Sequence, residues 1–216
     1  MTDRSVVYVT CDFEAAGLDT RLHSPLSIGA CVVSEEKLAF REYFDRDLVF
    51  YEEMKPVSMA YEMNAMRIGC SELKCLATAR GFVRSMRAVD DRLDPSHQRF
   101  DPLYVLEFMK NSCQDREVVR DRLISRLESL RQDRQILWLT DKEFDQVHLS
   151  ELLGQYQNSP LFKWASQRTM SRFRKYALGR YEMLGVRDCR LHPHKADEDA
   201  VFLATIAQPV IFGKNG

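Results

Sequence analysis

Residues 5–14, SVVYVTCDFE, are the most informative segment of this chain, because an apolar and β-branched run passes directly into two carboxylates. Such a run predicts a buried central strand. Residues two apart in a strand point to the same face, so we expect Asp12 and Glu14 to project together while Phe13 turns toward the core. Two buried carboxylates repel each other unless a cation lies between them, and their oxygen atoms suit Mg²⁺ or Mn²⁺. For this motif alone, an acidic turn at the end of a strand remains the preferred interpretation.

A second acidic segment, HKADED at residues 194–199, precedes an apolar run that predicts a buried helix. Five positions along a helix correspond to about 140° of rotation, so His194 and Asp199 converge only if His194 lies in the loop before the helix. Pro193 favours such a start, and Asp197 or a neighbour is expected to cap the first turn. The alternative is a solvated acidic helix start with an incidental histidine.

A third segment lies in the middle of the chain. Residues 135–140, QILWLT, predict a short strand, and residues 141–154 predict an amphipathic helix that ends at its glycine. Asp145 falls in the first turn of this helix, close to the end of the strand. The alternative is an ordinary acidic residue at a helix N-terminus, with a stabilisation of about 0.3–1 kcal/mol, and Asp141 and Glu143 suit that role at least as well.

Together these segments resemble a known family. The stretches CDFEAAGL, EFDQVHLSELL and HKADEDA resemble the three exonuclease motifs of the DnaQ-like 3′–5′ exonucleases, in the DEDDh subclass whose last motif is H-x4-D. The motifs occur in the family's order, from Asp12 to Asp199. The stretch ILWLTDKEFDQVHLSELLG also looks like a bacterial exoribonuclease subgroup. The resemblance implies an RNase H-like α/β fold and hydrolysis from the 3′ end.

The resemblance also implies roles for individual residues. Two Mg²⁺ or Mn²⁺ ions would be held by four carboxylates: Asp12, Glu14, Asp145 and Asp199. His194 would be the general base, with His192 as the alternative. Many relatives have Asn three or four positions before the second-motif Asp, where this chain has Asp141 and Lys142. Asp141 therefore stays open as an alternative ligand to Asp145.

Candidate substrate contacts come from two places. Gly17 and Leu18 lie where the terminal base stacks in the family, and Phe144 next to the second-motif Asp is a further candidate. Residues 161–181 hold six cations and no acid, with aromatic residues interleaved, which is the composition that a groove for single-stranded nucleic acid needs. We select Arg172 and Arg174 from this segment. An ordinary basic helix with aromatic core residues is an equally supported interpretation.

The resemblance further implies an α/β fold with a mixed five-stranded sheet flanked by helices. Residues 26–33 and 38–44 predict two further strands, joined to the first in an antiparallel meander. Extra helices, over roughly 51–131, are expected between the third strand and the second motif, most clearly at 75–89 and 115–131. Residues 90–102 predict a loop.

Composition is consistent with one exonuclease domain over residues 1–216, since 216 residues can bury a sizeable core. Lys plus Arg (31) nearly balance Asp plus Glu (32), so net charge does not identify a partner. Neither a signal peptide nor a long apolar run is evident, which predicts a cytoplasmic protein without membrane contact. The six cysteines are expected to be reduced thiols, and their spacing argues against a zinc site.

The resemblance therefore implies an exonuclease that shortens single-stranded RNA from the 3′ end to nucleoside 5′-monophosphates. RNA is favoured over DNA on the subgroup resemblance alone. A 3′–5′ DNA exonuclease for proofreading or repair is one alternative, and a non-catalytic nucleic-acid-binding module is another. Relatives often pair as homodimers, so a homodimer is an open option.

Overall fold

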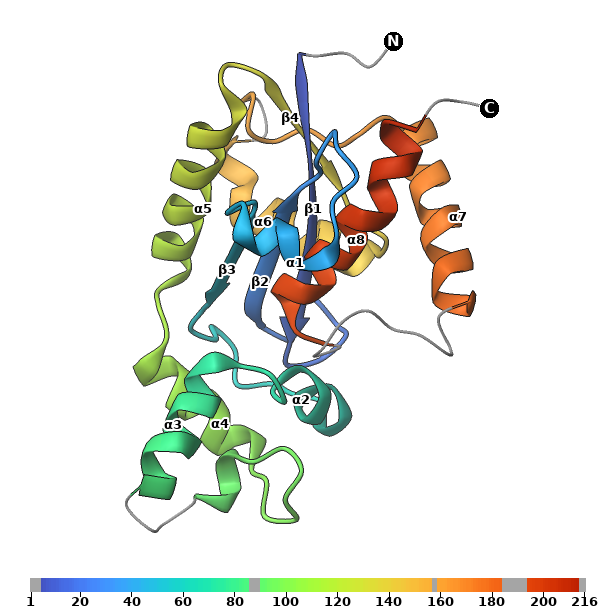
Figure 1. The fold of residues 1–216 in the computed structure, drawn as a ribbon. Coiled ribbons are helices and arrows are strands. Elements are labelled where there is room, and N and C mark those ends of the chain that lie inside the picture. The colour runs from blue at the N-terminus through green and yellow to red at the C-terminus, as the bar shows by residue number, and fades with distance from the viewer. Residues whose placement is uncertain (1–4, 86–89, 157–158, 184–193, 214–216) are drawn as a thin grey trace.

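A computed structural model describes residues 5–85, 90–156, 159–183 and 194–213, and it contains a mixed sheet flanked by helices (Figure 1). The sheet order is β3-β2-β1-β4. Its strands are β1 (Val6–Ala15), β2 (Pro25–Val32), β3 (Val49–Glu53) and β4 (Gln135–Leu139). The first three form an antiparallel meander, and β4 runs parallel to β1. The predicted α/β class is confirmed, but the described residues form four strands rather than five.

The predicted strand at 38–44 is wrong, because this segment forms the helix α1 (Phe40–Asp45). Its aromatic residues recur three and four positions apart, so they fit helical as well as alternating periodicity. The Glu42 carboxylate accepts a hydrogen bond from the Ala39 backbone N–H at 2.6 Å, which caps the helix start. The true third strand is β3, which pairs antiparallel with β2 a few residues further on.

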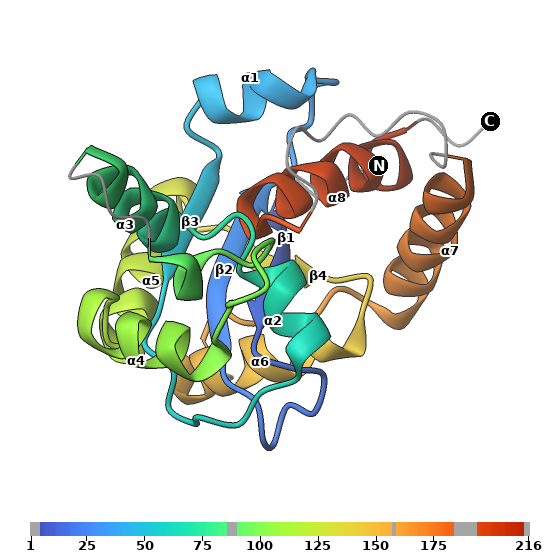
Figure 2. The ribbon, with the colours of Figure 1, turned by 90° about the horizontal axis from the view of Figure 1, so that it is seen from below.

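One face of the sheet is covered by α5 (Arg116–Arg131) and α6 (Glu143–Leu153), which confirms the two helices predicted for these segments (Figure 2). The odd-numbered residues of β1 point into this core, where Trp138 is fully buried and donates from its indole nitrogen to the Leu161 carbonyl at 2.9 Å. Gly154, which follows α6, keeps a right-handed conformation and leads into a 3-10 turn, Gly154–Tyr156. Because the odd-numbered residues of β1 face the α5 and α6 side, the even-numbered residues face the opposite side of the sheet.

That opposite side is covered by α8 (Ala196–Ile211), with α7 (Gln167–Met183) packed beyond it (Figure 2). Thr10 donates from its hydroxyl to the Ala200 carbonyl at 2.7 Å, which fixes α8 against β1. Phe173 is fully buried between α7 and α8, so at this position the aromatic residue of the basic segment belongs to the core.

The helical insertion follows β3 and contains α2 (Met63–Gly69), α3 (Lys74–Ser85) and α4 (Pro102–Ser112) before α5. Figure 1 shows α2, α3 and α4 beyond the carboxyl end of β1, beside the N-terminal end of α8. Leu73, Leu76 and Leu106 belong to a separate apolar cluster under these helices. The predicted helix at 75–89 is α3 as far as the structure describes it, and the predicted loop contains only a 3-10 turn, Asp91–Leu93. None of the helices in the described segments has the length and apolar composition that a bilayer crossing requires.

Candidate metal centre

The carboxyl end of β1 presents Asp12 and Glu14 on the face that carries α8, as the two-residue period of a strand requires. Asp12 is only 3% exposed, although a carboxylate is rarely buried without a partner. The neighbouring Thr10 on the same face is already bonded to the start of α8. The strand therefore delivers both acids to the gap between the sheet and the N-terminal turn of α8.

Gly29 makes this approach of α8 possible, and the sequence analysis did not identify it. It pairs with Asp12 across β1 and β2, so the two residues lie side by side on one face. A Cβ atom at this position would lie 1.9 Å from the Ala196 carbonyl oxygen, which no real contact allows. The missing side chain lets the backbone at the start of α8 rest directly on the sheet. A glycine inside a strand is the available signal for such an approach, but its partner appears only with the strand register.

His194 occupies the turn immediately before α8, as its convergence with Asp199 requires. Its backbone has a φ of 68°, in the left-handed region, and its N–H donates to the Asp199 carboxylate at 3.2 Å. Glu14, His194 and Asp199 each offer a ligand atom, and these atoms lie within 4.8 Å of one another. The imidazole is exposed whereas Asp199 is buried, so the histidine lies at the rim of the centre. His192 falls outside the described residues.

The N-cap of α8 is Lys195, and its own side chain makes no capping hydrogen bond, whereas Asp199 accepts the backbone N–H of His194 just before the helix. The Asp197 carboxylate instead accepts the backbone N–H of Glu198 at 3.0 Å. Lys195 Nζ lies 3.4 Å from the Asp197 carboxylate and 3.6 Å from that of Glu198. These two buried acids are therefore balanced by a lysine and remain apart from the metal-ligand candidates.

Asp145, in the first turn of α6, reaches the same end of β1 from the other side. Its Oδ1 accepts the backbone N–H of Phe13 at 3.0 Å, which fixes the carboxylate between Asp12 and the helix. The residue is fully buried, and no described residue donates a hydrogen bond to its Oδ2. Asp12, Asp141 and Asp145 offer ligand atoms within 4.8 Å of one another. The structure therefore brings both second-motif candidates next to Asp12.

Burial and mutual repulsion govern the ionisation of this cluster. Burial is the main factor that raises the pKa of Asp12 well above its usual range, and the charge of Asp145 raises it further. Burial likewise raises the pKa of Asp145 to about 7, against the opposing influence of Lys142. Without a divalent cation, the centre therefore holds fewer charges near neutral pH than its number of acids suggests.

Lys142, the residue in which the second motif departs from the family pattern, lies beside the acids. Its Nζ is 3.8 Å from Asp12 Oδ1, and the charge of Asp12 is the first cause of its raised pKa. The Lys142 side chain is 60% exposed, so its ammonium group remains hydrated if it moves away from Asp12. Lys142 thus supplies a positive charge where a metal ion would lie.

The donor set fits a hard divalent ion. Carboxylate oxygens suit Mg²⁺ and Mn²⁺, and the buried Asp145 Oδ2, which has no hydrogen-bond partner among the described residues, has an acceptor position that a cation would satisfy. The residues that could hold such ions are Asp12, Glu14, Asp145 and Asp199, with Asp141 as a further oxygen donor. The metal site is therefore chemically plausible from the residues alone.

The residues predicted to contact the substrate differ in how exposed their side chains are. Leu18 follows β1 and is 74% exposed, whereas Gly17 lies so close to the His23 ring that an added Cβ would be 2.4 Å from its Nδ1. The Phe144 ring is half-buried against His148, with ring centroids 4.5 Å apart. In α2, a Cβ at Gly69 would lie 3.0 Å from Glu14 Oε2, so the insertion forms one wall of the site.

Arg172 and Arg174, the two arginines selected from the basic segment, lie in different environments on α7. Arg174 donates from Nε to the Thr140 carbonyl at 3.2 Å and so attaches α7 to the loop that carries Asp141 and Lys142. Arg172 is exposed and lines a separate groove with Tyr176. The structure therefore places these two cations apart rather than in one binding row.

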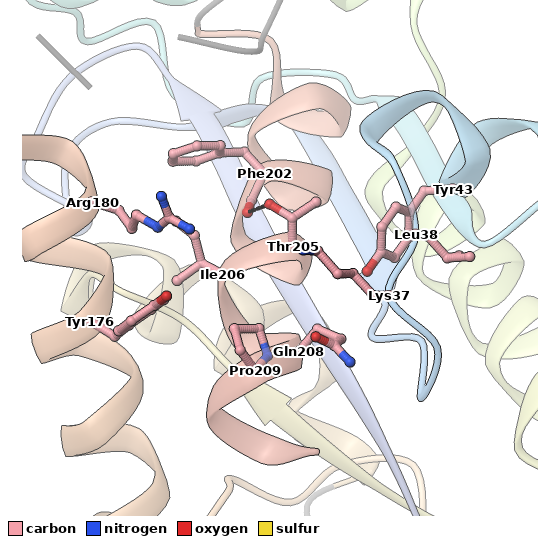
Figure 3. Close-up of a pocket in the computed structure, with 10 residues that line it drawn as sticks. All are labelled: Lys37, Leu38, Tyr43, Tyr176, Arg180, Phe202, Thr205, Ile206, Gln208 and Pro209. Carbon is pink, nitrogen blue, oxygen red and sulfur yellow. Dashed lines mark hydrogen bonds between the residues drawn. The ribbon is translucent and has the colours of Figure 1, made fainter. Parts of the chain in front are cut away.

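A hollow of about 430 Å³ lies between α7, the C-terminal half of α8 and the segment before α1 (Figure 3). Lys37 and Arg180 lie on opposite sides of it, and Tyr176 also lines the groove that contains Arg172. This basic surface is at the C-terminal end of α8, whereas the acidic centre is at its N-terminal end.

No protein-family model and no curated protein matches the chain. Among solved structures, exonuclease I of E. coli with single-stranded DNA, in a zinc-bound form, has a TM-score of 0.52 and 12% identity over 96% of this chain. The chain spans 40% of the length of exonuclease I. Pop2p of S. pombe, in its Mg²⁺- and Mn²⁺-bound form, has a TM-score of 0.51 and 14% identity over 97% of this chain and 86% of Pop2p. The likeness concerns the fold, and the chain therefore has the RNase H-like α/β fold found in exonuclease I and Pop2p.

Proposed function

We propose that this protein is a metal-dependent 3′–5′ exonuclease of the DEDDh type. The observation that carries the proposal is the meeting of three distant segments at one end of β1. Asp12 and Glu14 come from the strand, Asp145 from α6, and His194 and Asp199 from the start of α8. A cluster of buried acids is costly to maintain without a cation, so a purely structural role does not account for it.

Each residue contributes in a distinct way. Two divalent ions, when bound, would supply Lewis-acid stabilisation of the attacking and leaving oxygens. His194, at the exposed rim, accepts the proton of the attacking water, a role worth roughly 10²–10⁴ in rate. Asp199 positions the turn that carries this histidine through its hydrogen bond to the His194 N–H. The Phe13 N–H holds Asp145 in the orientation that leaves its Oδ2 available. The product would be a nucleoside 5′-monophosphate.

We further propose single-stranded RNA as the substrate, on the resemblance of the second motif to an exoribonuclease subgroup. Single-stranded DNA is the second candidate, because exonuclease I, whose fold this chain shares, was solved in complex with it. The two differ in the 2′-hydroxyl, which a protein can use to distinguish RNA from DNA. A non-catalytic binding module is the third candidate, and it would not require two bound ions.

The test uses one short RNA and its DNA equivalent, each labelled at the 5′ end and incubated with Mg²⁺ or Mn²⁺. We expect a ladder of products shortened one nucleotide at a time, absent with chelator and in the Asp12→Ala, Asp199→Ala double variant. The preferred substrate identifies the sugar. If a folded protein cleaves neither strand and calorimetry detects no binding of divalent ions at the acidic centre, the exonuclease proposal is wrong.

A further inference from the structure

A second cluster of metal-ligating side chains lies outside the acidic centre, where the insertion meets the sheet. Glu53 ends β3, Cys75 lies in the first turn of α3, and Cys113 follows α4. One carboxylate oxygen and the two Sγ atoms lie within 4.8 Å of one another. Because these residues are 22 and 38 positions apart in sequence, no spacing motif reveals the cluster.

Backbone pairing holds two of the three residues in place. The Lys55 N–H donates to the Gln114 carbonyl at 2.8 Å, and Met54 and Gln114 form an isolated β-bridge. The segment that follows Glu53 is therefore fixed beside the segment that follows Cys113. This arrangement does not depend on the thiol itself, so the cluster is built into the connection between β3 and α5.

The third residue is positioned by the carboxylate of Glu53. Its oxygens accept the backbone N–H groups of Lys74 and Cys75, the second at 2.9 Å, and so cap the start of α3. The Tyr51 hydroxyl also donates to Oε1, at 2.5 Å. Oε1 therefore has two donors, and Oε2 accepts the Cys75 N–H. The Cys75 thiol also hydrogen-bonds the Glu53 carboxylate, so a cation that displaces the thiol proton would take that acceptor position.

A cation that binds in this cluster must displace thiol protons. A hydrogen bond with Cys113, burial and the charge of Glu53 together raise the pKa of Cys75, in that order. The thiol thus stays protonated while no cation is near. A divalent ion that prefers sulfur would replace the thiol protons, which pass to the solvent, and would remove the repulsion from Glu53.

We propose that Glu53, Cys75 and Cys113 form a transition-metal site that takes Zn²⁺. Two thiolates and one carboxylate oxygen are ligands that Zn²⁺ accepts, whereas Mg²⁺ and Mn²⁺ prefer oxygen ligands only. A hollow of about 370 Å³, also lined by Thr78 and Ser112, adjoins the cluster and leaves room for a water as the fourth ligand. The site is distinct from the proposed exonuclease centre in both residues and metal class.

Such an ion would join three separate parts of the chain. It would tie the first turn of α3 and the end of α4 to the end of β3. Lys74, next to the proposed ligand in α3, has its Nζ 3.9 Å from the Asp197 carboxylate at the start of α8 and 4.0 Å from the centre of the Tyr51 ring. The zinc site would therefore stabilise the insertion against the part of the fold that carries the acidic centre.

The experiment is a Co²⁺ titration of the reduced full-length protein, because Co²⁺ bound by thiolates shows a charge-transfer absorption that oxygen ligands do not give. We expect one Co²⁺ per chain with this band, displaced by Zn²⁺. Cys75→Ala and Cys113→Ala should lose the band. The matched control Cys70→Ala, whose buried thiol lies 3.9 Å from the Met66 sulfur, should keep it. The Asp12→Ala, Asp199→Ala variant should also keep the band.

Glu53→Gln separates the carboxylate from the thiols. It should weaken Zn²⁺ affinity by more than the roughly 10–100-fold that follows loss of an outer-shell partner, while a weaker band persists. The proposal is overturned if reduced, folded wild-type protein gives no band, or if the band is equal in all the cysteine variants. It is also overturned if the protein isolated without reductant contains a Cys75–Cys113 disulfide and the reduced form still binds no Co²⁺.

Discussion

His194 is exposed, lies in a left-handed turn and has its backbone held by Asp199, so its imidazole can be removed without a change in the buried acids. We expect His194→Ala to lower the rate of strand shortening by roughly 10²–10⁴ while divalent-ion affinity changes little. Single-turnover rates and calorimetry measure the two quantities separately. His192→Ala is the matched control. Full activity in His194→Ala with loss in His192→Ala would assign the base to His192.

Asp145 is a fully buried acid whose Oδ2 has no hydrogen-bond partner among the described residues. In metal-free protein its pKa of about 7, against an ordinary value near 3.8, means that it contributes stability below pH 4 that is lost as pH rises through 7. We expect Asp145→Asn to remove this loss and to raise the free energy of unfolding at pH 8 by up to about 4 kcal/mol.

Urea unfolding in the presence of chelator, at pH 5 and pH 8, measures the effect of Asp145→Asn. The same variant should lose the stabilisation that Mn²⁺ gives the wild type, because the freed oxygen is replaced by an amide. An identical pH dependence of unfolding in variant and wild type would contradict the assignment of a raised pKa to this carboxyl group.

The start of α8 depends on Gly29, whose missing side chain admits the Ala196 backbone. We expect Gly29→Ala to displace α8 from β1 and to lower exonuclease activity by about 10²-fold, since small misplacements of catalytic groups have effects of that size. Gly154→Ala is a matched control, because a Cβ there meets nothing within 4 Å. Equal activity in both variants, measured on the same labelled strand, would show that α8 tolerates the shift.

The helix α7 offers a test of how the substrate is held. We expect Arg172→Glu to weaken binding of a longer single strand and to reduce the slope of log affinity against log salt by at least about 0.7, the share of one phosphate. Arg99→Glu, an exposed change of the same charge in the insertion, is the control. Fluorescence anisotropy over a salt series gives both slopes. Equal slopes would show that the α7 groove carries no phosphate.

Arg174 is expected to behave differently, because its Nε bonds the Thr140 carbonyl. Arg174→Glu should disturb the loop before Asp141 and weaken metal binding. The salt dependence of single-strand binding should stay unchanged.

The elements that the sequence predicted correctly are those with one dominant periodicity. The apolar and β-branched run in residues 5–14 predicts a strand, whose two-residue period places Asp12 and Glu14 on one face, and the pattern of α5 is equally clear. The segment that became α1 satisfied two periodicities, and local capping by Glu42 selected the helix. The five-residue β3 was missed because so short a run gains its identity from pairing with β2.

The candidate site could be predicted as a list of acids, but its supporting residues could not. Gly29 and Lys142 act through neighbours that are distant in sequence or through loop geometry, and neither has a local pattern of its own. The same limit applies to the Glu53, Cys75 and Cys113 cluster, which strand pairing and helix capping assemble. In this chain, sequence periodicity predicts helices and strands, whereas the residues that support the candidate site are identified only by tertiary contacts.

The acid stability of the whole fold depends in part on one buried histidine. His148 is fully buried against the Phe13 and Phe144 rings, and neither ring nitrogen has a hydrogen-bond partner among the described residues. Burial, and then the charge of Arg116, lower its pKa to about 4 from an ordinary 6.5. Its neutral form is compatible with the fold above pH 6.5, and stability is lost as pH falls toward 4 because only the unfolded chain takes up the proton.

We expect His148→Leu to leave stability near pH 7 unchanged or higher and to reduce the acid-induced loss by up to about 3 kcal/mol. The measurement is the difference in unfolding free energy between wild type and variant at pH 7 and pH 4.5. Taking this difference removes the opposite trend of the acidic centre, which is common to both proteins. A constant difference across this pH interval would show that His148 does not titrate on unfolding.

The contact between Gly29 and Ala196 joins an early strand to the last helix of the fold. During synthesis the N-terminal segments leave the ribosome first, and they can pair before α8 has been made. A nascent chain that ends at α7 already carries Asp12, Glu14 and Asp145 but lacks both His194 and Asp199. If the proposed activity is correct, the growing polypeptide is harmless to the message that encodes it until α8 has been made.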